Sequence, residues 1–241
     1  MVCFYTGRSV LLWHVNAISN QTRNNINMAK LTYVYKVFER FWHWSQAFLI
    51  LFLAVTGFEI HGSFNLMGFD AAVRWHNYAI WALVWLIVFA IFWHFTTGEW
   101  RQYIPTTKFI KAQVEYYITG IFRGAPHPTK KTVYNKFNPL QRFVYLGLKI
   151  FAIPVQIITG FLYYYYKYPS GGEIQSIDMV NLELVAIIHT IGAFALIAFV
   201  IAHVYLTTTG HKPTAAIKAM ITGWEELDHD EDDVEKRPEE S

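Results

Sequence analysis

The sequence contains a single cysteine, Cys3. A lone cysteine excludes a disulfide framework, an iron–sulfur cluster held by this chain, and the C-x-x-C-H motif that attaches c-type haem. A metal centre inside the chain would therefore have to be held by histidine, of which there are 10.

The sequence is also poor in charge. Only 16% of its 241 residues are charged, whereas 54% are hydrophobic and 18% are aromatic. This balance is too apolar for an ordinary soluble domain of this size, and the apolar residues fall in blocks, which indicates that lipid is the solvent. We expect membrane lipids to surround the chain and expect no nucleic-acid partner.

The apolar blocks predict an all-α membrane protein with a four-helix transmembrane bundle. About 20 residues of helix cross a hydrocarbon core. Aromatic residues such as Trp42, Trp75 and Trp93 lie at the ends of these blocks, where their rings suit the membrane interface. The predicted spans are residues 42–60, 76–95, 142–166 and 182–206.

Lysine and arginine predict the orientation of the spans. The loop after span one has only Arg74, and the loop after span three has only Lys167. The segment between spans two and three carries Arg101, Lys108, Lys111, Arg123, Lys130, Lys131 and Lys136. By the positive-inside rule, both termini and this middle segment face the cytoplasm.

The two ends of the chain differ from the membrane domain, which we place at residues 28–223. Residues 1–27 are polar and lack the apolar core of a signal peptide. We interpret Met28 as the natural start, and the alternative is that residues 1–27 form a disordered N-terminal extension. Residues 224–241 are strongly acidic, and this composition predicts a disordered tail.

Two histidines lie in span four, where an ionisable side chain marks a candidate site. His189 and His203 are 14 residues apart, which places them on one helix face and separates them by about 21 Å along the axis. One therefore lies near the outer leaflet and the other near the inner leaflet. This arrangement is typical of a chain with one metal site in each leaflet.

Each of these histidines has a potential partner at its own depth. His43 begins span one near the cytoplasmic face, level with His203, and His76 begins span two near the outer face, level with His189. Two imidazole pairs of this kind suit two low-spin haems that transfer electrons and have no open position for a substrate. Hydrogen bonding between helices or a proton relay is the alternative for these four residues.

Other histidines compete for the same roles. His94 lies on the same face of span two as His76 and could replace His43 as the partner of His203. His61 ends span one and could compete with His76. Solvated surface positions are expected for the remaining four: His14, His127, His211 and His229.

From about Tyr33 to Gly223 the chain resembles the cytochrome b subunit of respiratory formate dehydrogenases, nickel–iron hydrogenases and thiosulfate reductases. The resemblance rests on Arg40-Phe-Trp-His43-Trp44, on the 14-residue His189/His203 spacing, and on Phe137-Asn138-Pro-Leu-Gln141-Arg142. The last element is similar to the Tyr-Asn-x-x-Gln-Lys element of the family, and the match around His76 is looser.

The resemblance implies two non-covalent haem b groups: an inner one on His43 and His203, and an outer one on His76 and His189. It also implies a quinone, menaquinone or ubiquinone, beside the inner haem at Asn138. Gln141 and Lys149 are further candidates for the quinone site. The alternative for Asn138 is a role as a helix cap, since Pro139 follows it. The alternative for Lys149 is that its side chain extends to the membrane interface.

A working hypothesis follows from the resemblance. The chain would lie in the bacterial inner membrane and would connect a periplasmic iron–sulfur subunit and catalytic subunit, of hydrogenase, formate dehydrogenase or sulfur-compound reductase type, to the quinone pool. The direction of electron flow is open. The alternatives are a free-standing transmembrane haem b reductase, and a non-redox anchor or proton carrier.

Two further features concern span three. Thr56–Gly57 in span one and Thr159–Gly160 in span three form a weak internal repeat, in which Tyr145 takes the place of His43. Pro154 lacks an amide proton, frees the carbonyl of Ile150 and is expected to kink the helix.

Overall fold

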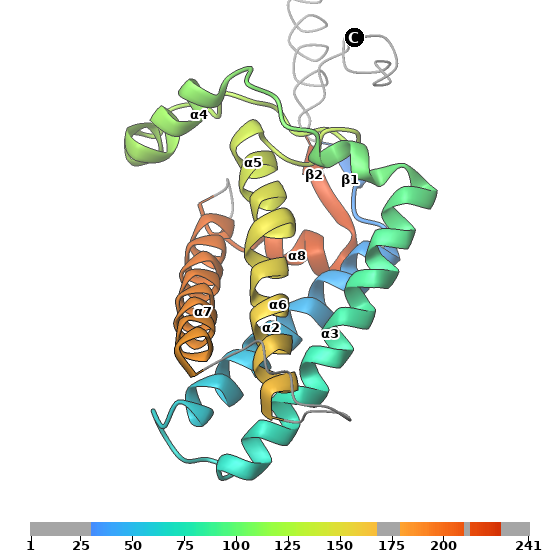
Figure 1. The fold of residues 1–241 in the computed structure, drawn as a ribbon. Coiled ribbons are helices and arrows are strands. Elements are labelled where there is room, and N and C mark those ends of the chain that lie inside the picture. Colours follow the sequence, from blue (N-terminus) through green and yellow to red (C-terminus); the bar gives the residue numbers. More distant parts are fainter. Residues whose placement is uncertain (1–29, 168–178, 210–212, 228–241) are drawn as a thin grey trace, which may run out of the picture.

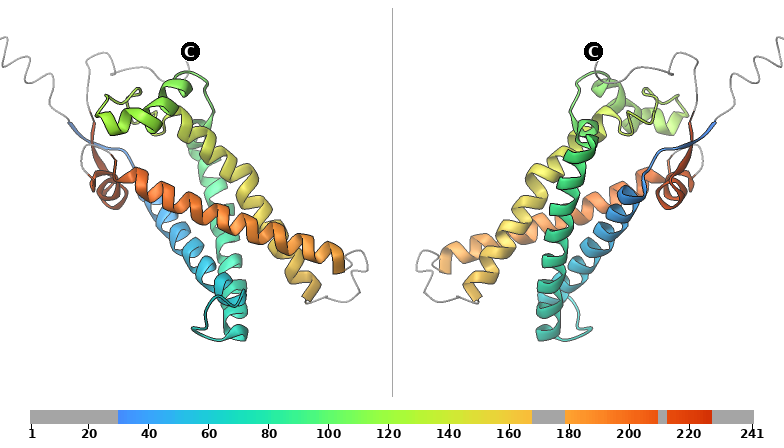
Figure 2. Two further views of the ribbon diagram at one scale, coloured as in Figure 1. Left: turned by 90° about the vertical axis from the view of Figure 1, so that its left-hand side faces the viewer. Right: turned by 90° about the vertical axis from the view of Figure 1, so that its right-hand side faces the viewer.

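The computed structural model describes residues 30–167, 179–209 and 213–227. Four long helical segments run through it, and Figure 2 shows the fourth crossing the third obliquely. They are α2 (Val37–Ile60), α3 (Phe69–Thr97), the continuous segment of α5 (Pro139–Gly147), η4 (Leu148–Ala152) and α6 (Ile153–Lys167), and α7 (Met179–Thr207). All four are long and apolar enough to cross a membrane, which confirms the predicted four-helix membrane fold.

The helices are longer than the apolar runs from which they are predicted, because polar side chains form hydrogen bonds with the backbone at the helix ends. The turn between α2 and α3 depends on Glu59, whose Oε1 accepts hydrogen bonds from the amides of Leu66, Met67 and Gly68 at 2.8, 2.7 and 2.7 Å. A carboxylate in this position satisfies amides that precede the first turn of a helix. The loop is therefore held close to the end of α2.

The third span departs from regular α-helix in its middle. Residues Leu148–Ala152 form a π-helical turn, η4, just before Pro154 in α6. A proline removes one backbone donor, and π turns and proline are recognised causes of irregularity within a helix. The predicted disturbance at Pro154 therefore takes the form of a widened turn on its N-terminal side.

The polar segments gather at one end of the bundle, which we call the loop end; the turn of residues 61–68 marks the opposite, far end (Figure 1). The loop end also contains the first residues of α2 and α5. Its short elements are β1 (Lys30–Tyr33), η1 (Glu99–Tyr103), α4 (Ile110–Glu115), η2 (Tyr116–Gly120), η3 (Ile121–Arg123), α8 (Ala215–Thr222) and β2 (Trp224–Leu227).

Strands β1 and β2 form an antiparallel ribbon that ties the start of the membrane domain to its end. Tyr33 pairs with Trp224, and their rings make an edge contact at 5.3 Å between centroids. The Nε1 of Trp44 donates to the carbonyl of Met220 at 3.0 Å. The ribbon includes residues 224–227, so the predicted disordered tail is wrong for this part, where backbone pairing and the ring contact provide order; residues 228–241 lie outside the described residues.

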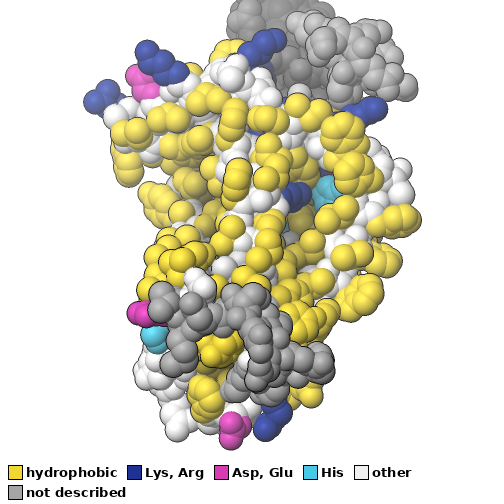
Figure 3. All heavy atoms as spheres, in the orientation of Figure 1, with side chains coloured by type: hydrophobic (Ala, Val, Ile, Leu, Met, Phe, Trp, Pro, Cys, Tyr) yellow, Lys and Arg dark blue, Asp and Glu magenta, His cyan; other side chains and the backbone are white. Residues whose placement is uncertain are grey.

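The outer surface of the helices is apolar. Apolar side chains cover most of the middle of the molecule in Figure 3, whereas charged side chains gather toward its two ends. Little of each span is buried within the protein, from 0% in α7 to 22% in α3. A surface of this composition and height faces lipid, so the chain is a multi-pass membrane protein.

The four spans pack as two pairs. α2 packs mainly on α3, and α6 mainly on α7, while among the described residues the Cα atoms of one pair seldom come within 8 Å of those of the other. Ring-bearing side chains meet across this boundary, for example Trp81 with Phe161 at 5.0 Å and Phe58 with Phe194 at 5.6 Å. The space between the two pairs is therefore bordered by side chains rather than by closely packed backbone.

Candidate functional site

Two histidines from the first and last spans meet near the loop end. The ring centroids of His43 on α2 and His203 on α7 are 6.2 Å apart, and the ring planes differ by 53°. Phe199, one turn before His203, stacks on its ring at 5.6 Å, and Trp44 makes an edge contact with His43 at 5.2 Å. We call His43 and His203 the loop-end pair.

A second pair of histidines meets toward the far end. The ring centroids of His76 on α3 and His189 on α7 are 6.5 Å apart, with an angle of 66° between the ring planes. Each Nδ1 lies 2.9 Å from a threonine hydroxyl, that of Thr56 for His76 and that of Thr159 for His189. We call His76 and His189 the far-end pair.

The spacing of both pairs fits a haem iron between them. A metal–imidazole bond of about 2.0 Å on each side, with each ring centre about 1.2 Å behind its nitrogen, gives about 6.4 Å between ring centroids. The observed values of 6.2 and 6.5 Å lie on either side of this figure. Neutral imidazoles are ligands that suit haem iron, so the residues present are able to hold the group.

Two glycines lie against the far-end pair. A Cβ atom added to Gly57 would come within 3.5 Å of Cε1 of His76, and one added to Gly160 would come within 3.2 Å of Cε1 of His189. The absence of a side chain at both positions leaves room for the imidazoles beside the helix backbone. The internal repeat of the sequence therefore brings its two Thr-Gly units to equivalent places.

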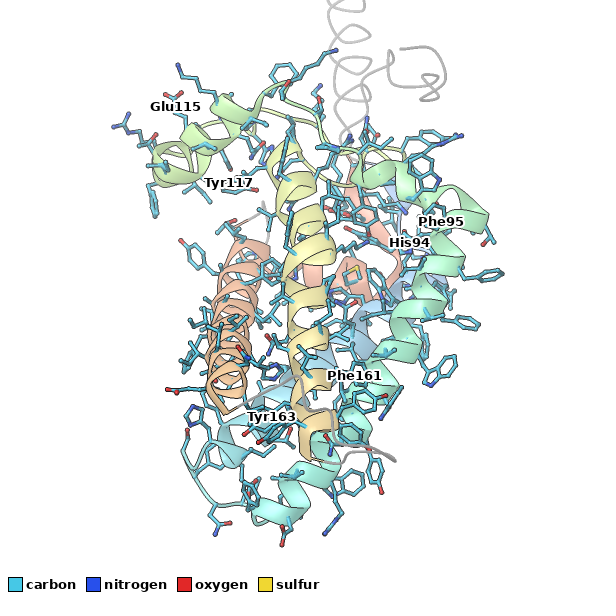
Figure 4. All side chains as sticks on the ribbon, viewed as in Figure 1. His94, Phe95, Glu115, Tyr117, Phe161 and Tyr163 are labelled. Carbon is cyan, nitrogen blue, oxygen red and sulfur yellow. The ribbon has the colours of Figure 1, made fainter. Side chains whose placement is uncertain are left out.

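The competing histidines lie elsewhere. His94, on the loop-end half of α3 (Figure 4), is buried; its Nδ1 lies 2.6 Å from the carbonyl of Ala90 and its Nε2 lies 3.4 Å from the hydroxyl of Tyr103. His61 is exposed at the end of α2. The ring that faces His203 is that of His43 on α2, and the ring that faces His189 is that of His76 on α3.

Among the described residues, one further histidine, His127, lies outside the two pairs. His127 is exposed, and its Nδ1 lies 2.8 Å from the carbonyl of Thr129. His14, His211 and His229 lie outside the described residues.

Asn138 and Gln141 begin helix α5. Oδ1 of Asn138 accepts from the amide of Gln141 at 2.8 Å, and Oε1 of Gln141 accepts from the amide of Asn138 at 3.0 Å. Nδ2 of Asn138 donates to the hydroxyl of Tyr117 at 2.9 Å. The helix cap offered as an alternative for Asn138 is confirmed, because this reciprocal arrangement satisfies backbone donors at the start of the helix.

Lys149 points into the protein from the π-helical turn η4. Its Nζ lies 3.2 Å from the ring centroid of Tyr103 and 5.2 Å from that of Trp42. Among the described residues no carboxylate lies within ion-pair distance of this ammonium group, and the aromatic faces stabilise it instead. Lys149 is therefore directed away from the solvent interface, and it forms with Tyr103, Trp42 and His94 a polar-aromatic cluster, which we call the Lys149 cluster.

Tyr103 is a member of the Lys149 cluster that the sequence does not single out. Burial raises the pKa of Tyr103, so its phenol remains protonated throughout the physiological range. The sequence offers only its position next to the basic segment as a signal. Its protonated phenol is a hydrogen-bond donor inside the protein, where it lies 3.4 Å from Nε2 of His94.

Ion pairs surround the start of α2 at the loop end. Nζ of Lys136, a side chain that is only 3% exposed, lies 2.6 Å from Glu39 and 3.3 Å from Glu99, and Lys36 lies 2.7 Å from Glu99. Burial alone would raise the pKa of Glu99, but Lys36 and Lys136 outweigh it and lower that pKa. These contacts hold η1, and with it Tyr103, against α2.

Similarity to known proteins agrees with this geometry. The sequence profile of the family described as "Prokaryotic cytochrome b561" matches residues 34–223. The "Putative cytochrome YdhU" of Escherichia coli (strain K12) is 30% identical over 80% of this chain and 74% of its own length.

Two further relatives carry the name "Probable Ni/Fe-hydrogenase B-type cytochrome subunit". The protein of Rhizobium leguminosarum bv. viciae is 28% identical over 83% of this chain and 91% of its own length. That of Cupriavidus necator is 29% identical over 80% of this chain and 82% of its own length. With the family match, the similarity covers the entire set of spans and both histidine pairs, so the chain belongs to the prokaryotic cytochrome b561 family and is a bacterial membrane b-type cytochrome of electron transfer.

Proposed function

We propose that this cytochrome holds two haem b groups, one on the loop-end pair His43–His203 and one on the far-end pair His76–His189. The observation that supports this most strongly is the presence of two facing imidazole pairs whose centroids are 6.2 and 6.5 Å apart. His189 and His203 lie on the same helix about 21 Å apart, a separation that supports one pair in each leaflet.

Haem b supplies a one-electron carrier at each pair. The four histidines would hold the two irons, two imidazoles to each, so that no ligand position would be left for a substrate. The protein around them excludes water and holds the two pairs at fixed depths between the helix pairs. The chain is therefore suited to moving electrons across the membrane rather than to transforming a substrate at the iron.

The partner follows from the named relatives. We propose that the chain is the membrane subunit of a respiratory oxidoreductase of nickel–iron hydrogenase type, because two relatives are named as hydrogenase cytochrome subunits. The positive-inside rule places the loop end in the cytoplasm and the far end toward the periplasm. An iron–sulfur subunit and its catalytic subunit would therefore exchange electrons with the far-end pair.

A quinone, menaquinone or ubiquinone, would react near the loop-end pair. Lys149 and Tyr103 are the donors that support this placement, since both are directed into the protein between α2, α3 and the third span. Asn138 and Gln141 lie at the start of the same span and would act through the position of that helix, because the cap already engages their side-chain oxygens. Quinone reduction there would take its protons from the loop-end side.

The haem content of the purified protein tests this proposal. A pyridine haemochrome assay should give about two haem b per chain, and the reduced-minus-oxidised spectrum should show b-type bands. Addition of a quinol to the oxidised protein should reduce the haem. Colourless protein from haem-replete cells would overturn the proposal and would favour a proton carrier or simple anchor; one haem per chain would overturn the two-site assignment.

A further inference from the structure

The two threonines of the internal repeat are bound to the far-end pair in the same way. Thr56 on α2 contacts His76 on the packed neighbour α3, and Thr159 on α6 contacts His189 on its packed neighbour α7. Both Oγ1–Nδ1 distances are 2.9 Å. Each pair of helices thus provides one imidazole and one hydroxyl to the same site.

The hydrogen bonds of the threonines determine the direction of each contact. Oγ1 of Thr56 lies 2.9 Å from the carbonyl of Phe52, and Oγ1 of Thr159 lies 2.7 Å from the carbonyl of Val155. A hydroxyl has one proton, and a carbonyl oxygen can only accept it, so the threonine donates to the backbone and accepts from the imidazole. Each Nδ1 therefore carries a proton, and Nε2 keeps the lone pair that a metal requires.

The loop-end pair lacks an equivalent arrangement at His43. Its Nδ1 is buried and has no hydrogen-bond partner among the residues that the structure describes. The two sites therefore differ in the hydrogen bonding of their histidines, and with it in the basicity of the ligands, a property that alters the stability of ferric relative to ferrous iron.

We infer that Thr56 and Thr159 are positioning residues that hold the far-end haem at a lower reduction potential than the loop-end haem. This inference rests on the proposed two-haem function. A hydrogen bond from Nδ1 raises the basicity of the imidazole, which favours ferric iron and lowers the potential. Each transfer then moves one electron downhill: it oxidises a ferrous haem at the far-end pair and reduces a ferric haem at the loop-end pair. The preferred direction is from the periplasmic partner toward the quinone.

A redox titration of the purified protein, followed by visible absorbance, tests this inference. The wild-type protein should show two one-electron components, and His76→Ala should remove the one with the lower potential. Thr56→Val with Thr159→Val keeps the shape and deletes both hydroxyls, and Thr56→Ser with Thr159→Ser is the matched control that keeps them.

We expect the valine variant to raise the lower potential or to lose far-end haem, while the serine variant stays within the wild-type range. A tenfold change in the affinity of the site for ferric relative to ferrous haem shifts the one-electron reduction potential by 59 mV. Loss of the hydrogen-bond partner of a ligating histidine lowers the affinity for the metal by about 10–100-fold. Three results would overturn the inference. They are two haems with unchanged potentials in the valine variant, an equal shift of potential in the valine and serine variants, and loss of the higher-potential component in His76→Ala. A wild-type protein without two haems would instead overturn the proposed function.

Discussion

The imidazole of His43 lies opposite that of His203, with 6.2 Å between the ring centroids. The first and the last of the four spans supply these residues, and the ring of His94 on α3 contacts Tyr103 instead. The pair therefore depends on the relation between α2 and α7, two helices whose backbones seldom approach each other among the described residues.

Replacement of His203 by alanine should remove one haem and leave the other. The remaining far-end haem should still be reduced by dithionite, whereas reduction by quinol should be lost, because the loop-end pair is the one near the proposed quinone site. His94→Ala is the matched control, since this buried histidine contacts Tyr103 and not His203. Pyridine haemochrome analysis should give about one haem for the first variant and about two for the second. The reverse result would show that the pairs are assigned incorrectly.

Replacement of the two repeat glycines should have unequal effects. A Cβ at position 160 would lie 3.2 Å from His189, which requires the ring to move by a few tenths of an ångström, whereas a Cβ at position 57 would make an ordinary contact at 3.5 Å with His76. We expect Gly160→Ala to weaken far-end haem binding by about tenfold, and Gly57→Ala to keep it. Haem retention during dilution of the purified proteins measures this difference. Equal retention would show that the site tolerates the closer approach.

Replacement of Lys149 by methionine should impair the reaction with quinol. Methionine retains most of the volume but removes the ammonium group, and a hydrogen bond from a charged group contributes about 1.5–3 kcal/mol. The expected rise in KM for a quinol analogue is therefore about ten- to a hundredfold. Lys111→Met, at an exposed lysine of α4, should leave KM unchanged. A haem content of about two in both variants would separate this effect from misfolding.

The ion pairs of Glu99 predict a dependence of stability on pH. The lowered pKa of Glu99 means that its contribution is fully present above the ordinary value of 4.5 and is lost as the pH falls through the folded-state pKa. The Tm of the wild-type protein should therefore fall as the pH drops below about 4.5, and that of Glu99→Gln should fall less over the same range. Parallel curves for the two proteins would show that Lys36 and Lys136 do not stabilise the carboxylate.

Replacement of Gly223 by alanine should loosen the ribbon of β1 and β2. Gly223 has φ 88°, and a Cβ there would lie 2.5 Å from the ring of Tyr33 and 2.8 Å from the carbonyl oxygen of Tyr35. Gly62→Ala is the control, because Gly62 has φ 79° and no atom within 4 Å of its Cβ position. The backbone cost of about 1–2 kcal/mol is common to both, so Gly223→Ala should lower Tm further. Equal Tm values would show that the ribbon accommodates the extra atom.

Much of this fold follows from the sequence because lipid restricts the chain to a few regular forms. Long apolar runs predict the four spans, and the period of the helix places His189 and His203 on one face. Depth also indicates which histidines are level with each other. Depth alone does not indicate which helix packs next to the His203 side of span four. From the sequence, His43 and His94 are therefore both possible partners of His203.

The parts that the sequence does not predict depend on contacts between distant segments. Trp224 and the acidic residues after it read as disordered by composition, yet pairing with β1 orders residues 224–227. The repeat of Thr56–Gly57 and Thr159–Gly160 is visible in the sequence, but only the packing of neighbouring helices brings each hydroxyl to an imidazole. Likewise, Tyr103 reaches Lys149 because the ion pairs of Glu99 position η1.

The ribbon of β1 and β2 has a consequence for biosynthesis. β1 leaves the ribosome before the first span and β2 after the last, so this pairing can form only after all four spans have been made. Domains generally fold as units during synthesis, and contacts between the ends of a chain form last. The loop-end pair shares this timing, because α2 and α7 supply its two imidazoles. A haem held by this pair would therefore be inserted at a late stage of maturation, after all four spans have entered the bilayer.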